Sequence, residues 1–320
     1  MSIPSFVGMV TREGCIVGGP LNKNPQVRRT VPATPSEPGP RPTSSPPGAA
    51  PRRPTPGGTL TRMEKGRIKH VIVVGSGKGG VGKSTTTALL AAALHRQGYS
   101  VGVLDADITG PSVPRLFGIK GPLLDKGEGI EPAASSGGIL AVSSQFLVED
   151  EQTPVIWRGP LVTRMILQFF GGVNWGTLDY LLIDMPPGTS DVPLTVFQTI
   201  PLDGMIFILS PQELAALIVR KAMNMARELH VPLLGVIENF SFFECPHCHE
   251  RTRLFGPSGV QKVADEYGIP VLGTVPVDPK LSELGDAGRI EEFRSEAADG
   301  LAAALTASLT RLQQGRIEML

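Results

Sequence analysis

The sequence predicts an α/β fold in which a mainly parallel sheet carries helices on both faces. Three observations support this class: short, nearly continuous apolar runs, helical patterns between many of them, and a glycine-rich turn joining the first run to the first helix. The apolar runs, typical of strands buried on both faces, are His70–Val74, Val101–Asp105, Ile139–Ser143, Tyr180–Asp184, Met205–Leu209, Leu233–Ile237 and Val271–Val275. The helical patterns are Ser84–Gln97, Leu161–Phe170, Glu213–Leu229 and Gly259–Tyr267. Ligands in such sheets bind at the carboxyl ends of the strands.

The chain divides by composition into a tail and a folded domain. Residues 1–67 are crowded with Pro, Gly, Ser and Arg and lack apolar periodicity. Such a segment cannot bury enough surface to offset the entropy lost on ordering, so we expect a disordered tail. Residues 68–320 form the predicted domain, and the 41% of hydrophobic residues in the whole chain suffice for a sizeable core.

Charge and cysteine content exclude several protein classes. The 30 basic and 30 acidic residues balance, which gives no support for nucleic-acid binding. The chain has no apolar run of about 18 residues, so no membrane span is predicted, and its first residues predict no secretory signal. Three cysteines cannot build a disulfide framework, which indicates a reducing compartment. We expect a cytoplasmic protein with a flexible bacterial tail. The alternative is the mitochondrial matrix, because the tail is Arg-rich and acid-poor, although its prolines disfavour the amphipathic helix of a transit peptide.

A phosphate-binding motif follows the first apolar run. The segment Gly77–Ser84 fits G-x-x-x-x-G-K-[ST], whose glycines let backbone N–H groups converge on phosphate oxygens at a helix N-terminus. Lys83 should reach the β- and γ-phosphates, and Ser84 should hold Mg²⁺. The predicted nucleotide-binding residues here are Gly77, Lys78, Gly79, Gly80, Val81, Gly82, Lys83, Ser84 and Thr85.

Two further apolar runs end in carboxylates that fit the same site. Asp105 ends the second run and Asp107 stands two residues further on, while Asp184 ends the later run, just before Met-Pro-Pro-Gly188. A strand that finishes in Asp places a carboxylate at the ligand-binding edge, where it can hold Mg²⁺ or its waters. We assign Asp184 and Asp105 to the magnesium site, Asp107 to orienting the attacking water, and the Gly188 amide to the γ-phosphate.

A Cys-Pro-His-Cys turn follows the run Leu233–Ile237. Cys245 and Cys248 have the spacing that grips one metal ion or cluster. A zinc ribbon would need a second pair, and the remaining cysteine is Cys15 in the tail. Two copies of the chain would supply four thiolates, enough for a [4Fe–4S] cluster on a twofold axis. The alternatives are a Cys₂His₂ zinc site with His247 and His249, a thioredoxin-like redox pair, and a purely structural pair of thiols.

The phosphate loop has a lysine early in its sequence, Lys78, which is typical of deviant P-loops. In this feature the loop resembles that of the MinD, ParA and nitrogenase iron protein group. In those families this lysine reaches the nucleotide of the partner subunit. The resemblance therefore implies a catalytic role for Lys78 beside Lys83 and Asp107, and a homodimer that encloses ATP between its subunits.

The combined motifs closely resemble the Mrp/ApbC family of iron–sulfur cluster carrier ATPases, over Ile68 to the mid-280s. The matching stretches are Gly77–Ser84, Asp105–Ser112, Trp157–Pro160, Asp179–Gly188, Glu238–Asn239 and Cys245–Cys248. The resemblance implies a homodimer that holds a labile [4Fe–4S] cluster at Cys245 and Cys248 of both subunits. It implies slow ATP hydrolysis coupled to cluster loading or transfer, with apo iron–sulfur proteins and cluster scaffold proteins as partners. It makes Asn239 the base-contacting asparagine.

Departures from the family pattern are local, and three other functions compete. Thr109 and Pro257 replace the usual Tyr and His, and Cys15 alone cannot form the amino-terminal cluster of a eukaryotic branch. A MinD- or ParA-like positioning ATPase would bind membrane or DNA, but we expect the stripe Leu301, Leu305, Leu309 and Leu312 to pack in the core. An electron-transfer ATPase would need its cysteines in two loops, and a zinc-stabilised ATPase would hold zinc at the cysteine pair.

Overall fold

The computed structural model describes residues 62–315 apart from 109, 121–122, 126–128, 148–158, 190 and 213–216. These residues all belong to one compact unit, Gly58–Leu320. Several parts of the sequence prediction lie outside the described residues. These are nearly all of the predicted tail, including Cys15, then Thr109 and Trp157, and the first four residues of the predicted helix Glu213–Leu229.

All seven predicted strands are present, and they pair mainly in parallel. The sheet order is β10-β9-β8-β1-β7-β2-β6-β5, and β9 pairs with one more strand, β11, in parallel. The long strands are β1 (Ile68–Gly75), β2 (Val101–Asp105), β6 (Leu140–Ser143), β7 (Leu178–Asp184), β8 (Gly204–Leu209), β9 (Leu233–Glu244) and β11 (Val271–Val277). The short strands are β5 (Ala133–Ala134) and β10 (Arg251–Thr252), both antiparallel to their neighbours, and a separate pair, β3 (Leu124–Asp125) with β4 (Ile130–Glu131).

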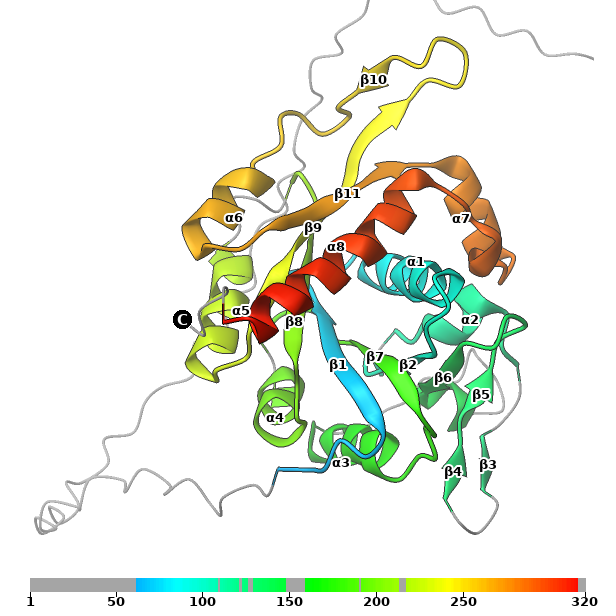
Figure 1. The fold of residues 1–320 in the computed structure, drawn as a ribbon. Helices are drawn as coiled ribbons and strands as arrows, with labels where there is room; N and C mark the ends of the chain where they lie inside the picture. The colour runs from blue at the N-terminus through cyan, green and yellow to red at the C-terminus, as the bar shows by residue number, and fades with distance from the viewer. Residues whose placement is uncertain are drawn as a thin grey trace, which may run out of the picture. The chain divides into compact units, whose positions relative to one another are not determined.

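Helices cover both faces of the sheet, as the sequence predicts (Figure 1). One face carries α1 (Lys83–Arg96), α2 (Val113–Phe117), α7 (Pro279–Asp286) and α8 (Glu296–Gln313), together with the 3₁₀ turn Ile290–Glu292. The other carries α3 (Gly159–Gly171), α4 (Asp191–Thr199), α5 (Leu217–Glu228) and α6 (Val260–Tyr267). A second 3₁₀ turn spans Ser144–Leu147. The predicted helices correspond to α1, α3, α5 and α6, whereas α2, α4 and α7 were not predicted.

The carboxy-terminal helix α8 is a core element. Its leucines Leu301, Leu305 and Leu309 are at most 3% exposed, and Leu312 is partly buried against the same cluster. This confirms the expectation that the leucine stripe packs in the core. No helix within the described residues has the length and apolar character needed to cross a membrane.

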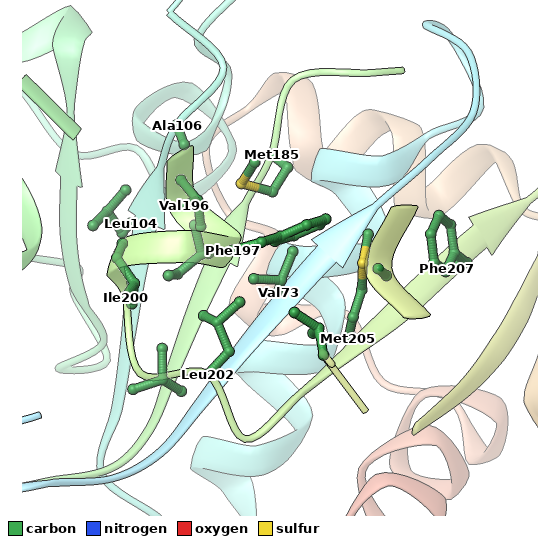
Figure 2. Close-up of a cluster of buried hydrophobic side chains, with 14 of the residues drawn as sticks. Val73, Leu104, Ala106, Met185, Val196, Phe197, Ile200, Leu202, Met205 and Phe207 are labelled. Atoms are coloured by element: carbon green, nitrogen blue, oxygen red, sulfur yellow. The ribbon is translucent and has the colours of Figure 1, made fainter. Parts of the chain in front are cut away.

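An apolar layer under α4 supports the loops that carry the candidate site. Figure 2 shows Phe197 of α4 beside Val73 of β1 and Met205 of β8, with Met185 at the end of β7 nearby. Gly75 ends β1 in van der Waals contact with this layer, because a Cβ there would lie 2.2 Å from Cε of Met205. The ends of β1 and β7 therefore rest on a close-packed base.

Contacts with this domain begin before Ile68. The Met63 amide donates to the carbonyl of Thr199 at 2.8 Å, and the Met63 side chain packs against Gly171 at the end of α3. Lys65 forms an ion pair with Asp203, whose carboxylate also accepts a hydrogen bond from the Val71 amide.

Candidate functional site

The loop from β1 to α1 forms a cavity of about 260 Å³ at the carboxyl edge of the sheet. Most of the predicted phosphate loop lines it, together with Asp107, Gly110, Ser112 and Pro187. Gly80 and Gly82 have φ of 84° and 75°, a left-handed conformation that favours glycine. Gly77 is required for another reason, since a Cβ there would lie 2.5 Å from Cγ2 of Val219 in α5.

Asp184 is the centre of a buried hydrogen-bond network behind this loop. Its carboxylate is 0% exposed and accepts from Lys83 Nζ at 2.8 Å and from Ser84 Oγ at 2.5 Å. Thr87 Oγ1 donates to its second oxygen at 2.8 Å. Sequence reasoning missed Thr87, although its place one helical turn after Lys83 puts both on the same side of α1.

The residues present fit a magnesium ion. The Ser84 hydroxyl and the Asp184 carboxylate supply the hard oxygen donors that Mg²⁺ prefers, and they lie next to the phosphate loop. Lys83 neutralises part of the carboxylate charge at the same point.

Asp105 is tied to the loop that follows β2. Its carboxylate, 1% exposed, accepts from the amides of Asp107 at 3.1 Å and Ser112 at 3.2 Å, and from Ser143 Oγ at 3.1 Å. Burial, together with the nearby negative charge of Asp184, raises the pKa of Asp105 to about 7 in spite of Lys83. Through its hydrogen bonds with the amides of Asp107 and Ser112, the Asp105 side chain orients the loop that carries Asp107.

Asp107 and Gly188 both lie close to the phosphate loop. Asp107 lines the cavity, and its Oδ2 is 4.0 Å from Lys83 Nζ. The Gly188 amide, which we assigned to the γ-phosphate from sequence, donates to the carbonyl of Ser76 at 3.0 Å. This bond joins the loop after β7 directly to the phosphate loop.

Asn239 on β9 supports the phosphate loop in this structure. It is 4% exposed, and its Nδ2 donates to the Val81 carbonyl at 2.8 Å while its Oδ1 accepts from the Phe240 amide at 3.0 Å. The base contact implied by family resemblance is not tested by this arrangement. Lys78, in contrast, is exposed, and it also lines a second cavity of about 190 Å³ bounded by Phe240 and Phe255.

The cysteine pair lies in the turn between β9 and β10, beyond the same sheet edge. The Cys245 amide donates to the Glu250 carbonyl at 3.0 Å, and the His249 amide donates to the Cys245 carbonyl at 2.9 Å. The backbone amides of Cys248 and His247 lower the pKa of the Cys245 thiol, which favours its thiolate. Cys245 is half-buried and Cys248 is exposed.

The turn does not match two of the alternative interpretations. His247 and His249 are exposed, and His249 Nδ1 lies 3.3 Å from a Glu244 oxygen. Across the part of the chain that the structure describes, no three His, Cys, Asp or Glu side chains come together as a metal site. A redox pair of the thioredoxin type lies at a helix N-terminus, whereas these cysteines lie in a β-hairpin.

Together, the parallel sheet, the glycine-rich loop before α1 and the Lys83–Asp184 network define a nucleotide-binding P-loop protein. The chain belongs to the NUBPL iron-transfer P-loop NTPase family (ParA), whose model matches residues 67–310.

Two relatives from other organisms support this assignment. An iron–sulfur cluster carrier protein of Methanocaldococcus jannaschii is 49% identical over 229 residues, which cover 71% of this chain and 79% of the relative. The cytosolic Fe–S cluster assembly factor CFD1 of Saccharomyces cerevisiae is 45% identical over 225 residues, covering 68% and 77%.

Solved structures agree on the fold. A nucleotide-binding protein of Archaeoglobus fulgidus, solved in complex with ADP, superposes with a TM-score of 0.65 at 46% identity and covers 72% of this chain and 90% of its own. The cell division ATPase MinD of Pyrococcus furiosus superposes with a TM-score of 0.54 at 19% identity, covering 76% and 99%, and shares the fold alone.

Proposed function

We propose that this protein is an ATP-dependent carrier of a labile [4Fe–4S] cluster, which a homodimer holds between its subunits and transfers to apo-proteins in the cytoplasm. One observation carries the proposal: the turn that holds half-buried Cys245 and exposed Cys248 follows β9 at the same edge of the sheet as the phosphate loop. Each chain supplies two thiolates there, and a cluster needs four ligands. The names of the relatives support the same cargo.

The nucleotide chemistry falls to residues around the phosphate loop. In the proposal, backbone amides of Gly77–Thr85 and the Lys83 ammonium bind the phosphates, and Ser84 and Asp184 hold Mg²⁺ with Asp105 behind them. When bound, the ion neutralises charge on the phosphates. Asp107 orients the attacking water, and Lys78 reaches the nucleotide of the partner subunit. The exposure of Lys78 and the position of Asp107 in the cavity support these roles.

Anaerobic reconstitution with iron and sulfide tests the cargo. We expect about four iron and four sulfide per dimer, with the broad thiolate-to-iron absorbance of a cluster. Cys248→Ser should lose both while still binding nucleotide, because the phosphate loop is built from other residues. Protein that stays colourless and holds no iron after reconstitution would refute the proposal.

A matched variant in the same turn separates a cluster from zinc. His247→Ala removes an exposed imidazole and leaves both thiols in place. A thiolate-bound cluster should survive this change with unchanged iron content, since histidine is not among its ligands. Stoichiometric zinc in the wild type, reduced by His247→Ala, would favour the zinc-stabilised ATPase instead.

A further inference from the structure

Phe240 has an unusual backbone conformation at the point where β9 leaves the phosphate loop. Its φ is +57°, in the left-handed region, where a bulky residue without a compensating reason is rare. The strand pairing is irregular here, because Asn239 pairs with Val275 and Phe243 with Val277, so that residues 240–242 oppose Pro276 alone. A β-bulge of this kind bends a strand and redirects the residues after it. Figure 1 shows the end of β9 and β10 projecting away from the rest of the sheet.

The same residue contacts the phosphate loop. The Phe240 ring reaches Gly82, because its Cζ lies 3.3 Å from where a Gly82 Cβ would be. The preceding residue, Asn239, holds Val81 of the loop through its side-chain amide. The Phe240 ring also meets Phe255 at 6.5 Å between centroids, and it borders the cavity of about 190 Å³ that Lys78 lines. The ring therefore touches the loop and has space beside it to move.

We propose that Phe240 is the positioning residue through which nucleotide binding at the phosphate loop moves the Cys245–Cys248 turn. The inference rests on the proposed function, since it concerns how the two sites of the carrier communicate. A displacement of Val81 and Gly82 by bound phosphate presses on the Phe240 ring and changes the bend of the bulge. The five residue-to-residue steps from Phe240 to Cys245 span about 17 Å in an extended strand, so a rotation of about 10° at the bulge displaces the cysteine turn by about 3 Å.

Hydrogen–deuterium exchange of the full-length, cluster-free protein tests this link without any cluster. In the wild type, Mg-ADP or a non-hydrolysable ATP analogue should change amide exchange in residues 241–252 by at least about fivefold, the lower end of coupling between two protein sites. In Phe240→Ala this response should fall to within about twofold of the nucleotide-free rate, while peptides of the phosphate loop remain protected.

Two variants control the experiment. Phe240→Gly also removes the ring, and it adopts the left-handed conformation without cost, so it gives the same expected loss if Phe240→Ala folds poorly. Phe242→Ala removes a ring from the same strand that packs under Arg251 within the hairpin, and it should keep the nucleotide response. A full response in the Phe240 variants, or no response in the wild type, overturns the inference. A protein that shows the coupling but holds no iron would refute the carrier function and leave this inference standing.

Discussion

A methyl group added at Gly82 should destabilise the protein more than one added at Gly80, although both glycines belong to the phosphate loop. Each has a left-handed φ, which costs an alanine about 1–2 kcal/mol. Nothing lies within 4 Å of a Cβ at Gly80, but a Cβ at Gly82 would lie 2.1 Å from Nδ2 of Asn239. Crowding of this kind costs about 1–3 kcal/mol. We therefore expect Gly80→Ala to lose about 1–2 kcal/mol of unfolding free energy and Gly82→Ala about 2–5 kcal/mol.

Urea denaturation measures both losses, provided that the slope with denaturant is the same for each variant. Asn239→Ala removes the clashing amide and leaves the Val81 carbonyl without its donor, at a cost of about 1–3 kcal/mol. In that background only the milder contact with the Phe240 ring, at 3.3 Å, remains, so Gly82→Ala should cost nearly the same as Gly80→Ala, and a double-mutant cycle reports the difference as a coupling energy. Equal losses for the two glycine variants in the wild-type background would show that Asn239 does not brace the loop.

Burial and charge lead to three further predictions. Asp184→Asn leaves the buried Lys83 ammonium without its carboxylate. Release of phosphate from ATP should therefore stop, and the unfolding free energy should fall by about 3–5 kcal/mol. Unchanged ATP turnover would contradict the role of Asp184. Burial lowers the pKa of His70, so the unfolded chain binds its proton more readily, and stability should decline as pH falls below about 6.5. His70→Gln should show a smaller decline in urea midpoint between about pH 7.5 and 5.5. Leu305→Ala, at a fully buried position of α8, should cost about 2–5 kcal/mol, with the partly buried Leu312→Ala as the milder control in the same denaturation assay.

The sheet could be predicted from sequence because its strands are buried on both faces. Such strands are continuous apolar runs, and a run of that kind has few other uses in a protein of this length. The same reasoning placed the end of β9 at Ile237, seven residues too early. The polar residues Glu238, Asn239 and Ser241 interrupt the apolar run, while backbone pairing with β11 and β10 continues to Glu244. Pairing of backbone groups leaves no trace in side-chain hydrophobicity.

The helices that sequence reasoning missed are short and contain proline near their starts. Pro114 and Pro193 occupy the first turns of α2 and α4, where a missing N–H costs nothing. For α7 a usable signal was present: Asp278 caps the helix by accepting from the Lys280 amide at 2.8 Å, and Pro279 follows it. An Asp-Pro pair before a polar-apolar pattern is typical of a helix start, so α7 was predictable from its own residues.

Sequence motifs identified the residues of the site better than the contacts that hold those residues in place. The phosphate loop, Asp107 and Asp184 lie close together, because strand ends of a parallel sheet meet at one edge. Two contacts depend on loop conformations that no residue pattern encodes. They are the hydrogen bond from the Gly188 amide to the Ser76 carbonyl and the one from the Asn239 side-chain amide to the Val81 carbonyl. Those contacts arise from long-range packing rather than from local sequence.

The different exposure of the two sites follows from what each would do in the proposed carrier. A phosphate site works by holding fixed dipoles and charges, and Lys83 and Asp184 are accordingly almost completely buried. A cargo that passes to another protein must be reached by that protein's own ligands, and Cys248 is accordingly exposed. In the proposed dimer, a cluster shared between two hairpins would be released when the hairpins separate, without unfolding either chain. In the proposed carrier, nucleotide binding would therefore act on the cargo by moving only the end of β9 and the hairpin that follows it, which makes the bulge at Phe240 the place where such control would be exerted.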